Sequence, residues 1–177
     1  MDKTTFLQEA QKYVEGLRRF ITVHELPGEW FGVADHVAVK GRDAADFEQL
    51  LKLFRPLAQQ LTCIDMDGRR LATAWLKEPI AIGNFGSVEW VEIMEPRPEK
   101  VGKDVVGFEH MEFYFPDFVA IRAVLDHKGV KYEMEQNPGH QWVDIVINQT
   151  GQELKLNNRT LADVIPEELA SGKAYLV

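Results

Sequence analysis

Cysteine is nearly absent from this chain of 177 residues, since Cys63 is the only one. A single cysteine cannot form an internal disulfide, and it excludes zinc sites built from several thiolates. Nowhere do 18 apolar residues follow one another, so a membrane-spanning helix is not expected. The opening residues 1–5 are polar and unlike the apolar core of a signal peptide. These features together predict a cytoplasmic protein without a membrane partner.

Basic residues are also scarce, with 20 Lys and Arg against 28 Asp and Glu and a formal net charge of −8. The densest basic spots are the pairs Arg18-Arg19 and Arg69-Arg70. Binding to a phosphate backbone needs clustered Lys and Arg, so a nucleic-acid partner is not expected.

A helical segment is predicted at the start of the chain. Apolar side chains recur there at spacings of three and four, as on one stripe of an amphipathic helix: Phe6, Ala10, Tyr13, Val14, Leu17 and Phe20. Pro27 and Gly28 then end the pattern. Residues 1–30 are therefore interpreted as an N-terminal helical extension, and residues 31–177 as the main domain.

An internal repeat is the most informative feature of that domain. The sequences ADHV at 34–37 and FEHM at 108–111 each place an acid and a histidine inside a predicted strand. A helix opening on Asp-Phe follows each of them, and further strands come after it. A charged linker at 99–104 separates the two halves, about 31–98 and 105–170. We predict an α+β fold of paired βαβββ modules that form a curved, partly closed mixed sheet.

His36 and His110 occupy matching positions of the repeat. Side chains of a strand alternate between its faces, so His36 should share a face with Ala38, and His110 with Phe108 and Glu112. The opposite faces are more apolar and suit the helices. Both histidines are therefore expected to point into the space that the sheet encloses.

Glu92 is the candidate third ligand of a metal held by these two histidines. Two imidazoles and a carboxylate suit a divalent transition metal and leave positions open for water or substrate. Glu112 follows His110 by two residues and is predicted to orient an imidazole, to carry a proton, or to be a rival ligand. The alternative is that these residues are ordinary hydrogen-bonded or solvated side chains of a sheet.

The order of short motifs resembles a known family. The motifs are ADHV, DGR, KEPI, VE followed by prolines, and GFEHME, and they span residues 31–166. They are similar to the YecM family of metal-binding proteins, within the vicinal oxygen chelate superfamily. The resemblance implies a divalent metal held by one residue from the first and last strand of each half.

Three of those ligands carried over by the resemblance are His36, Glu92 and His110. At the fourth position, in the sequence GQELKL, Lys155 stands where the superfamily has a carboxylate. An ammonium offers only donors and repels a divalent cation. Lys155 could therefore bind a substrate anion beside a metal held by three ligands, or pair with Glu92 in a metal-free cavity. Substitution of the missing ligand by Glu153 is a third alternative.

The function that these features favour is a metal-dependent isomerase, lyase or dioxygenase acting on a small, oxygen-rich anionic molecule. The metal would be zinc, nickel, manganese or iron, with Glu112 as a proton carrier and Lys155 as an anion contact. The alternative is a non-catalytic, metal-free protein that binds a small molecule in the same cleft, or an interaction protein that keeps only the scaffold. Paired modules often dimerise, so a homodimer is a further possibility.

Overall fold

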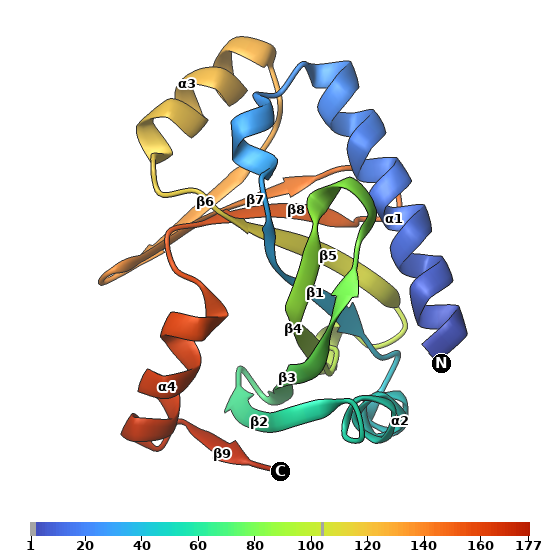
Figure 1. Ribbon diagram of the computed structural model, residues 1–177. Helices are drawn as coiled ribbons and strands as arrows, with labels where there is room; N and C mark the ends of the chain where they lie inside the picture. The colour runs from blue at the N-terminus through green and yellow to red at the C-terminus, as the bar shows by residue number, and fades with distance from the viewer. Residues whose placement is uncertain (1–2, 104) are drawn as a thin grey trace.

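One mixed sheet runs through the computed structural model, which describes residues 3–103 and 105–177 (Figure 1). Residues 1 and 2 of the predicted extension, and Asp104 at the end of the predicted linker, lie outside that description. The strands of the described chain are β1 (Ala34–Lys40), β2 (Ala58–Met66), β3 (Arg69–Ala81), β4 (Ser87–Met94), β5 (Gly107–Tyr114), β6 (Glu133–Asn137), β7 (His140–Val146), β8 (Glu153–Asn157) and β9 (Ala174–Leu176). The helices are α1 (Lys3–His24), α2 (Ala44–Phe54), α3 (Phe118–Lys128) and α4 (Leu161–Ser171), with short 3-10 helices at Gly28–Phe31, Gly83–Phe85 and Pro98–Lys100.

The strand order confirms the predicted pairing of two βαβββ modules. The order is β6-β7-β8-β5-β1-β4-β3-β2-β9, so each module contributes four neighbouring strands in the same internal sequence. β1 and β5, the first strands of the two modules, are antiparallel neighbours at the centre. The sheet does not close, because β6 and β9 remain at its edges. The two histidine-bearing strands are thus brought side by side.

Caps explain why both module helices begin just after an aspartate. The side chain of Asp43 accepts a hydrogen bond from the backbone N–H of Asp46 at the start of α2. Asp117 does the same for Ala120 at the start of α3. An aspartate at this position satisfies a backbone donor that the first helical turn leaves free. The Asp-Phe pair of the sequence repeat marks the helix start only at Asp117-Phe118, because in α2 the cap is Asp43 and Asp46-Phe47 lies inside the helix.

The main hydrophobic core lies on one face of the sheet. Side chains of α1, α2 and α3 join those of the strands in a single buried cluster. From α1, Phe6, Tyr13 and Leu17 are almost fully buried in it. The segment predicted as an N-terminal extension therefore completes the core that both modules share.

The C-terminal strand β9 was not predicted from the sequence. It has only three residues, too few to show an alternating pattern, and it pairs with β2 at the edge of the sheet. α4 connects it to β8 (Figure 1). Over the residues that the structure describes, no helix is long and apolar enough to cross a membrane. The predicted cytoplasmic location stays a prediction.

Candidate metal centre

Two β-bulges shape the pairing of β1 with β5. The partners of residues 34 and 36 are consecutive on β5, so Asp35 has no partner in the register. The partners of residues 108 and 110 are likewise consecutive on β1, so Glu109 has none. A bulge inserts one extra residue and re-aims the side chains around it. In both modules the extra residue is the acid that precedes the histidine.

The bulges allow each acid to contact the histidine that follows it. Successive side chains of a regular strand point to opposite faces, which would keep such neighbours apart. Here Oδ2 of Asp35 lies 2.8 Å from Nδ1 of His36, and Oε2 of Glu109 lies 3.2 Å from Nδ1 of His110. A carboxylate at Nδ1 favours a proton there, so that Nε2 keeps the lone pair that binds metals.

Each carboxylate is itself held in place. Oδ2 of Asp35 accepts a hydrogen bond of 3.0 Å from the backbone N–H of Leu161, the first residue of α4. Glu109 accepts a hydrogen bond from the buried ammonium of Lys40. Burial raises the pKa of Glu109, but His110 and Lys40 outweigh it and lower the pKa to about 2. Glu109 is therefore ionised throughout the physiological range.

The bulge at Glu109 also corrects one expectation about faces. Phe108 was expected on the same face as His110, because the two positions differ by two in the sequence. Instead the extra residue turns Phe108 into the main core, where its ring centroid lies 4.8 Å from that of Tyr13. Regular alternation fails there because a bulge breaks the period of two.

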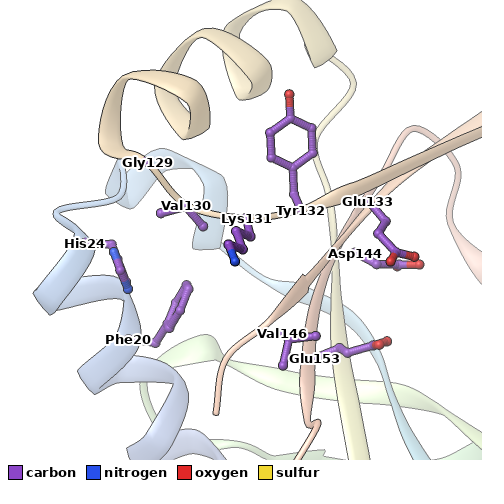
Figure 2. A pocket seen from close by; sticks show the side chains of 10 residues that line it. All are labelled: Phe20, His24, Gly129, Val130, Lys131, Tyr132, Glu133, Asp144, Val146 and Glu153. Carbon is purple, nitrogen blue, oxygen red and sulfur yellow. The ribbon is translucent and has the colours of Figure 1, made fainter. Parts of the chain in front are cut away.

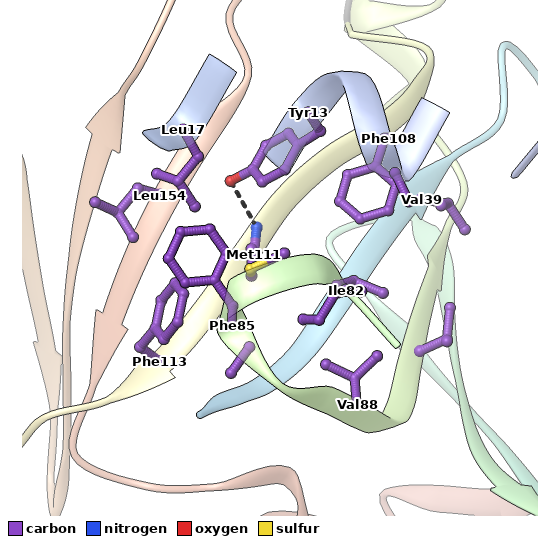
Figure 3. Close-up of a cluster of buried hydrophobic side chains, with 14 of the residues drawn as sticks. Tyr13, Leu17, Val39, Ile82, Phe85, Val88, Phe108, Met111, Phe113 and Leu154 are labelled. Carbon is purple, nitrogen blue, oxygen red and sulfur yellow. Dashed lines mark hydrogen bonds between the residues drawn. The ribbon is translucent and has the colours of Figure 1, made fainter. Parts of the chain in front are cut away.

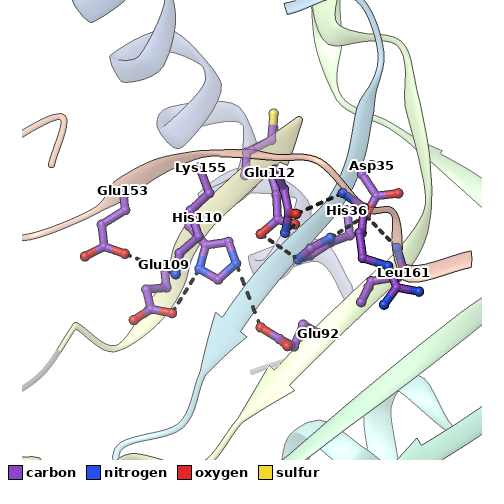
Figure 4. Close-up of polar contacts among 12 residues, drawn as sticks. Asp35, His36, Glu92, Glu109, His110, Glu112, Glu153, Lys155 and Leu161 are labelled. Atoms are coloured by element: carbon purple, nitrogen blue, oxygen red, sulfur yellow. Dashed lines mark hydrogen bonds and ion pairs between the residues drawn. The ribbon is translucent and has the colours of Figure 1, made fainter. Parts of the chain in front are cut away.

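The two imidazoles meet on the other face of the sheet. His36 and His110 are each 3% exposed, and their ring centroids are 5.6 Å apart. Oε2 of Glu92, from β4, lies 3.8 Å from Nε2 of His110. One possible ligand atom from each of these three residues lies within 4.8 Å of the other two. The structure thus brings together the three residues that the sequence proposed as ligands (Figure 4).

Glu112 faces the same space from β5. Its Oε2 atom lies 3.8 Å from Nε2 of His36, while Oε1 accepts a hydrogen bond of 2.6 Å from Nδ2 of Asn157. The carboxylate at Nδ1 of His36 is that of Asp35 instead. Asp35 and Glu109, which the sequence analysis did not single out, are the carboxylates that orient the imidazoles.

The electrostatic environments of the two histidines differ. Burial lowers the pKa of His36, but the charges of Glu112 and Asp35 outweigh it and raise the pKa to about 9. Burial and the charge of Lys155 lower the pKa of His110 to about 3. Burial raises the pKa of Glu112. At neutral pH and without a metal, these pKa values leave His110 neutral and His36 protonated.

Lys155 occupies the position in the second module that Glu92 occupies in the first. Glu92 pairs with residue 38 across β1 and β4, and Lys155 pairs with residue 112 across β5 and β8. Residues 38 and 112 each follow a histidine by two positions. Nζ of Lys155 lies 3.3 Å from Asp144 and 3.6 Å from Glu153. Burial lowers the pKa of Lys155, but these two acids outweigh it and raise the pKa, so the residue stays charged.

The residues present fit a divalent metal. Nε2 of His110 is buried and, within the described chain, has no hydrogen-bond partner. A buried polar atom left without a partner is unfavourable unless a water or an ion completes it. Imidazole nitrogens and carboxylate oxygens are the donors that zinc and related metals accept.

Tyr13 supports the sheet directly behind His110. Its hydroxyl accepts a hydrogen bond of 3.0 Å from the backbone N–H of Met111 (Figure 3). The same hydroxyl donates a hydrogen bond to the backbone carbonyl of Glu153. The phenol thus joins β5 to β8 next to the bulge. Burial raises its pKa well above the usual 10, so the hydroxyl remains a donor.

A cavity of about 860 Å³ lies next to this site and not within it (Figure 2). Its lining includes Phe20, Tyr132, Asp144 and Glu153, and none of the three candidate metal ligands. Asp144 and Glu153 are also the partners of Lys155. Asp144 and Glu153 thus line the cavity and also contact Lys155.

The sequence of the chain matches the YecM protein family over residues 2–168. The fold is that of the vicinal oxygen chelate superfamily. The chain belongs to the YecM family, which confirms the resemblance noted in the sequence.

Two solved structures illustrate the fold. "Structural Genomics, Protein EC4020" is similar with a TM-score of 0.77 and 16% identity, over 93% of this chain and 92% of that one. A single-residue variant of the Streptomyces coelicolor methylmalonyl-CoA epimerase, in complex with 2-nitronate-propionyl-CoA, has a TM-score of 0.51 and 19% identity, over 75% of this chain and 97% of that one. Among curated proteins, none matches the sequence.

Proposed function

We propose that this protein binds one divalent transition metal through His36, Glu92 and His110 and acts on a small, oxygen-rich anionic molecule. The observation that carries the proposal is the pair of buried imidazoles, each with a carboxylate at Nδ1 and with Nε2 directed toward a shared space. Zinc, nickel, manganese and iron all accept this donor set.

A metal in this place would act as a Lewis acid toward a substrate oxygen. The chain's own residues would hold the substrate and exclude water around it. Lys155 is an ammonium beside the centre, and its charge would attract a substrate carboxylate or a developing oxyanion. Isomerase, lyase and dioxygenase chemistry all fit this arrangement, because a fold by itself does not select a reaction.

The second candidate is a metal-free protein that binds a small molecule in the same cleft. It would be favoured by an ion pair between Glu92 and Lys155 that neutralised the site. Throughout residues 3–103 and 105–177, no such pair is within contact distance, and the lysine lies beside Asp144 and Glu153 instead. Glu92 is thus left directed at His110, which supports the metal-binding candidate.

Thermal unfolding with and without metal tests the proposal. A ligand that binds only the folded state at 100 times its Kd stabilises that state by about 2.7 kcal/mol. We expect zinc or manganese to raise the Tm of the chelator-treated wild type by several degrees, and His36→Ala to show no such shift. His127→Ala, at an exposed position on α3, is the matched control and should respond like the wild type. Equal responses of wild type and His36→Ala would contradict the proposal.

A further inference from the structure

Two tryptophans continue a row of site residues across the sheet. Trp90 on β4 is the direct strand partner of His36, and Trp75 on β3 is the direct partner of Trp90. Residues that are paired directly across neighbouring strands lie on the same face of a sheet. Glu92 follows Trp90 by two positions on the same strand and also faces the site. Both indoles are therefore on the face of the candidate metal ligands.

Packing in the core does not account for these two indoles. Both are half-buried, whereas Trp30 is 2% exposed and belongs to the main core. Among the described residues, the two clusters of buried hydrophobic side chains, and the side chains packed against them, include neither Trp75 nor Trp90. Grouped apolar surface that lies outside the core is typical of a binding site.

The two rings are stacked across the strands. Their centroids are 5.3 Å apart, and their planes differ by 9°. Neighbouring strands lie about 4.7–4.9 Å apart, so each ring stands over its own strand. Trp75 covers the face of Trp90 that lies on the side of β3. Because β1 is the other neighbour of β4, the second face of Trp90 lies on the side of His36.

This second face of Trp90 suits a planar aromatic ring. Aromatic rings prefer offset stacks, in which each ring covers part of the other. Beyond His36, the row continues with Glu112 and then with the ammonium of Lys155. A cation would also be attracted to an indole face, but it has the wrong charge for a place beside a metal and this ammonium. An anion that carries a planar ring matches both ends of the row.

We propose that the oxygen-rich anion on which this protein acts carries a planar aromatic ring, which stacks on Trp90 while its oxygens bind at the metal. The inference rests on the proposed metal site and names the class of molecule that the site accepts.

Binding of two matched dianions tests the proposal. Phthalate and cis-cyclohexane-1,2-dicarboxylate carry the same two carboxylates on a planar and on a saturated ring. Titration calorimetry measures both dissociation constants on protein loaded with zinc, or with nickel, manganese or ferrous iron where it retains that metal better. Because the two acids differ in basicity, their ratio in Trp90→Leu is the baseline. We expect the preference for phthalate to be about 2- to 13-fold larger in the wild type, the range of an aromatic stacking contact.

Two further variants separate stacking from a change in folding. Trp90→Phe keeps a planar ring and should retain most of the preference for phthalate. Tyr175→Leu removes an exposed ring from β9 at the edge of the sheet and should behave like the wild type. Metal affinity, measured by competition with a chromophoric chelator, should be the same in all of these proteins.

Fluorine NMR of the wild type labelled with 5-fluorotryptophan tests the contact without relying on a variant. The signal that is missing from Trp90→Phe belongs to Trp90. We expect phthalate to shift this signal and to leave that of Trp30, in the core, unchanged.

Three results would overturn the inference alone: equal preferences in wild type and Trp90→Leu, no binding of phthalate by the metal-loaded wild type, or an unchanged Trp90 signal when phthalate binds. Absence of metal binding by the wild type would instead overturn the proposed function.

Discussion

At the scale of single residues, the centre depends on contacts between neighbours in the sequence. Asp35 and Glu109 each orient the imidazole of the next residue, which only a bulged strand permits. The Asp-His and Glu-His pairs are visible in the sequence as part of the repeat. Their role was not predicted because regular alternation places such neighbours on opposite faces. Asn157, which holds Glu112, has no signal in the sequence at all.

The hydroxyl of Tyr13 is expected to stabilise the fold through its two buried hydrogen bonds. Tyr13→Phe would leave the N–H of Met111 and the carbonyl of Glu153 buried without their partner. An unsatisfied buried group costs about 1–3 kcal/mol, so the free energy of unfolding should fall by that amount. Denaturant unfolding at neutral pH measures it. Tyr175→Phe, at an exposed tyrosine, should change it by less than about 0.5 kcal/mol. A similarly small loss in Tyr13→Phe would show that the hydroxyl does not support the sheet.

At the scale of elements, periodicity and turn residues were sufficient to predict two modules with the same order of strands and helices. The strand order confirms that prediction. β9 was not predicted because three residues are too few to show an alternating pattern. The two bulges were not predicted because they interrupt the alternation of side chains along β1 and β5. Contacts between segments far apart in the sequence accompany these features, as the contact of Phe108 with Tyr13 illustrates.

Arg70 connects three elements of the first module. On β3, its side chain contacts Glu95 just after β4 and Glu48 on α2. Burial raises the pKa of Glu95, but hydrogen bonds from Arg70 outweigh it and lower the pKa below its usual 4.5. A lowered pKa in the folded state stabilises the protein above pH 4.5, and the benefit is lost as the pH falls through the lowered value.

Comparison of wild type with Glu95→Gln across pH tests this connection. We expect the wild type to be more stable than the variant at about pH 6–7, and the difference to shrink as the pH falls below about 4.5. Denaturant unfolding at a series of pH values measures the difference. A difference that stays constant from about pH 7 to about pH 3 would mean that the ionised carboxylate is not the stabilising group.

At the scale of the whole molecule, the candidate centre lies at the junction of the two modules. Of the three candidate ligands, His36 and Glu92 come from the first module, and His110 comes from the second. The antiparallel pairing of β1 with β5 brings the two sets together. Neither module contains all the candidate ligands, so the site requires both modules.

The metal content of the purified protein tests the central claim most directly. Wild type, His36→Ala, His110→Ala and the control His127→Ala would each be incubated with zinc, nickel, manganese or ferrous iron, desalted and measured by elemental mass spectrometry. We predict about one metal ion per chain in wild type and control for at least one of these metals, and close to none in the other two variants. No metal in the wild type, or full metal in both variants, would contradict a centre shared by the two modules.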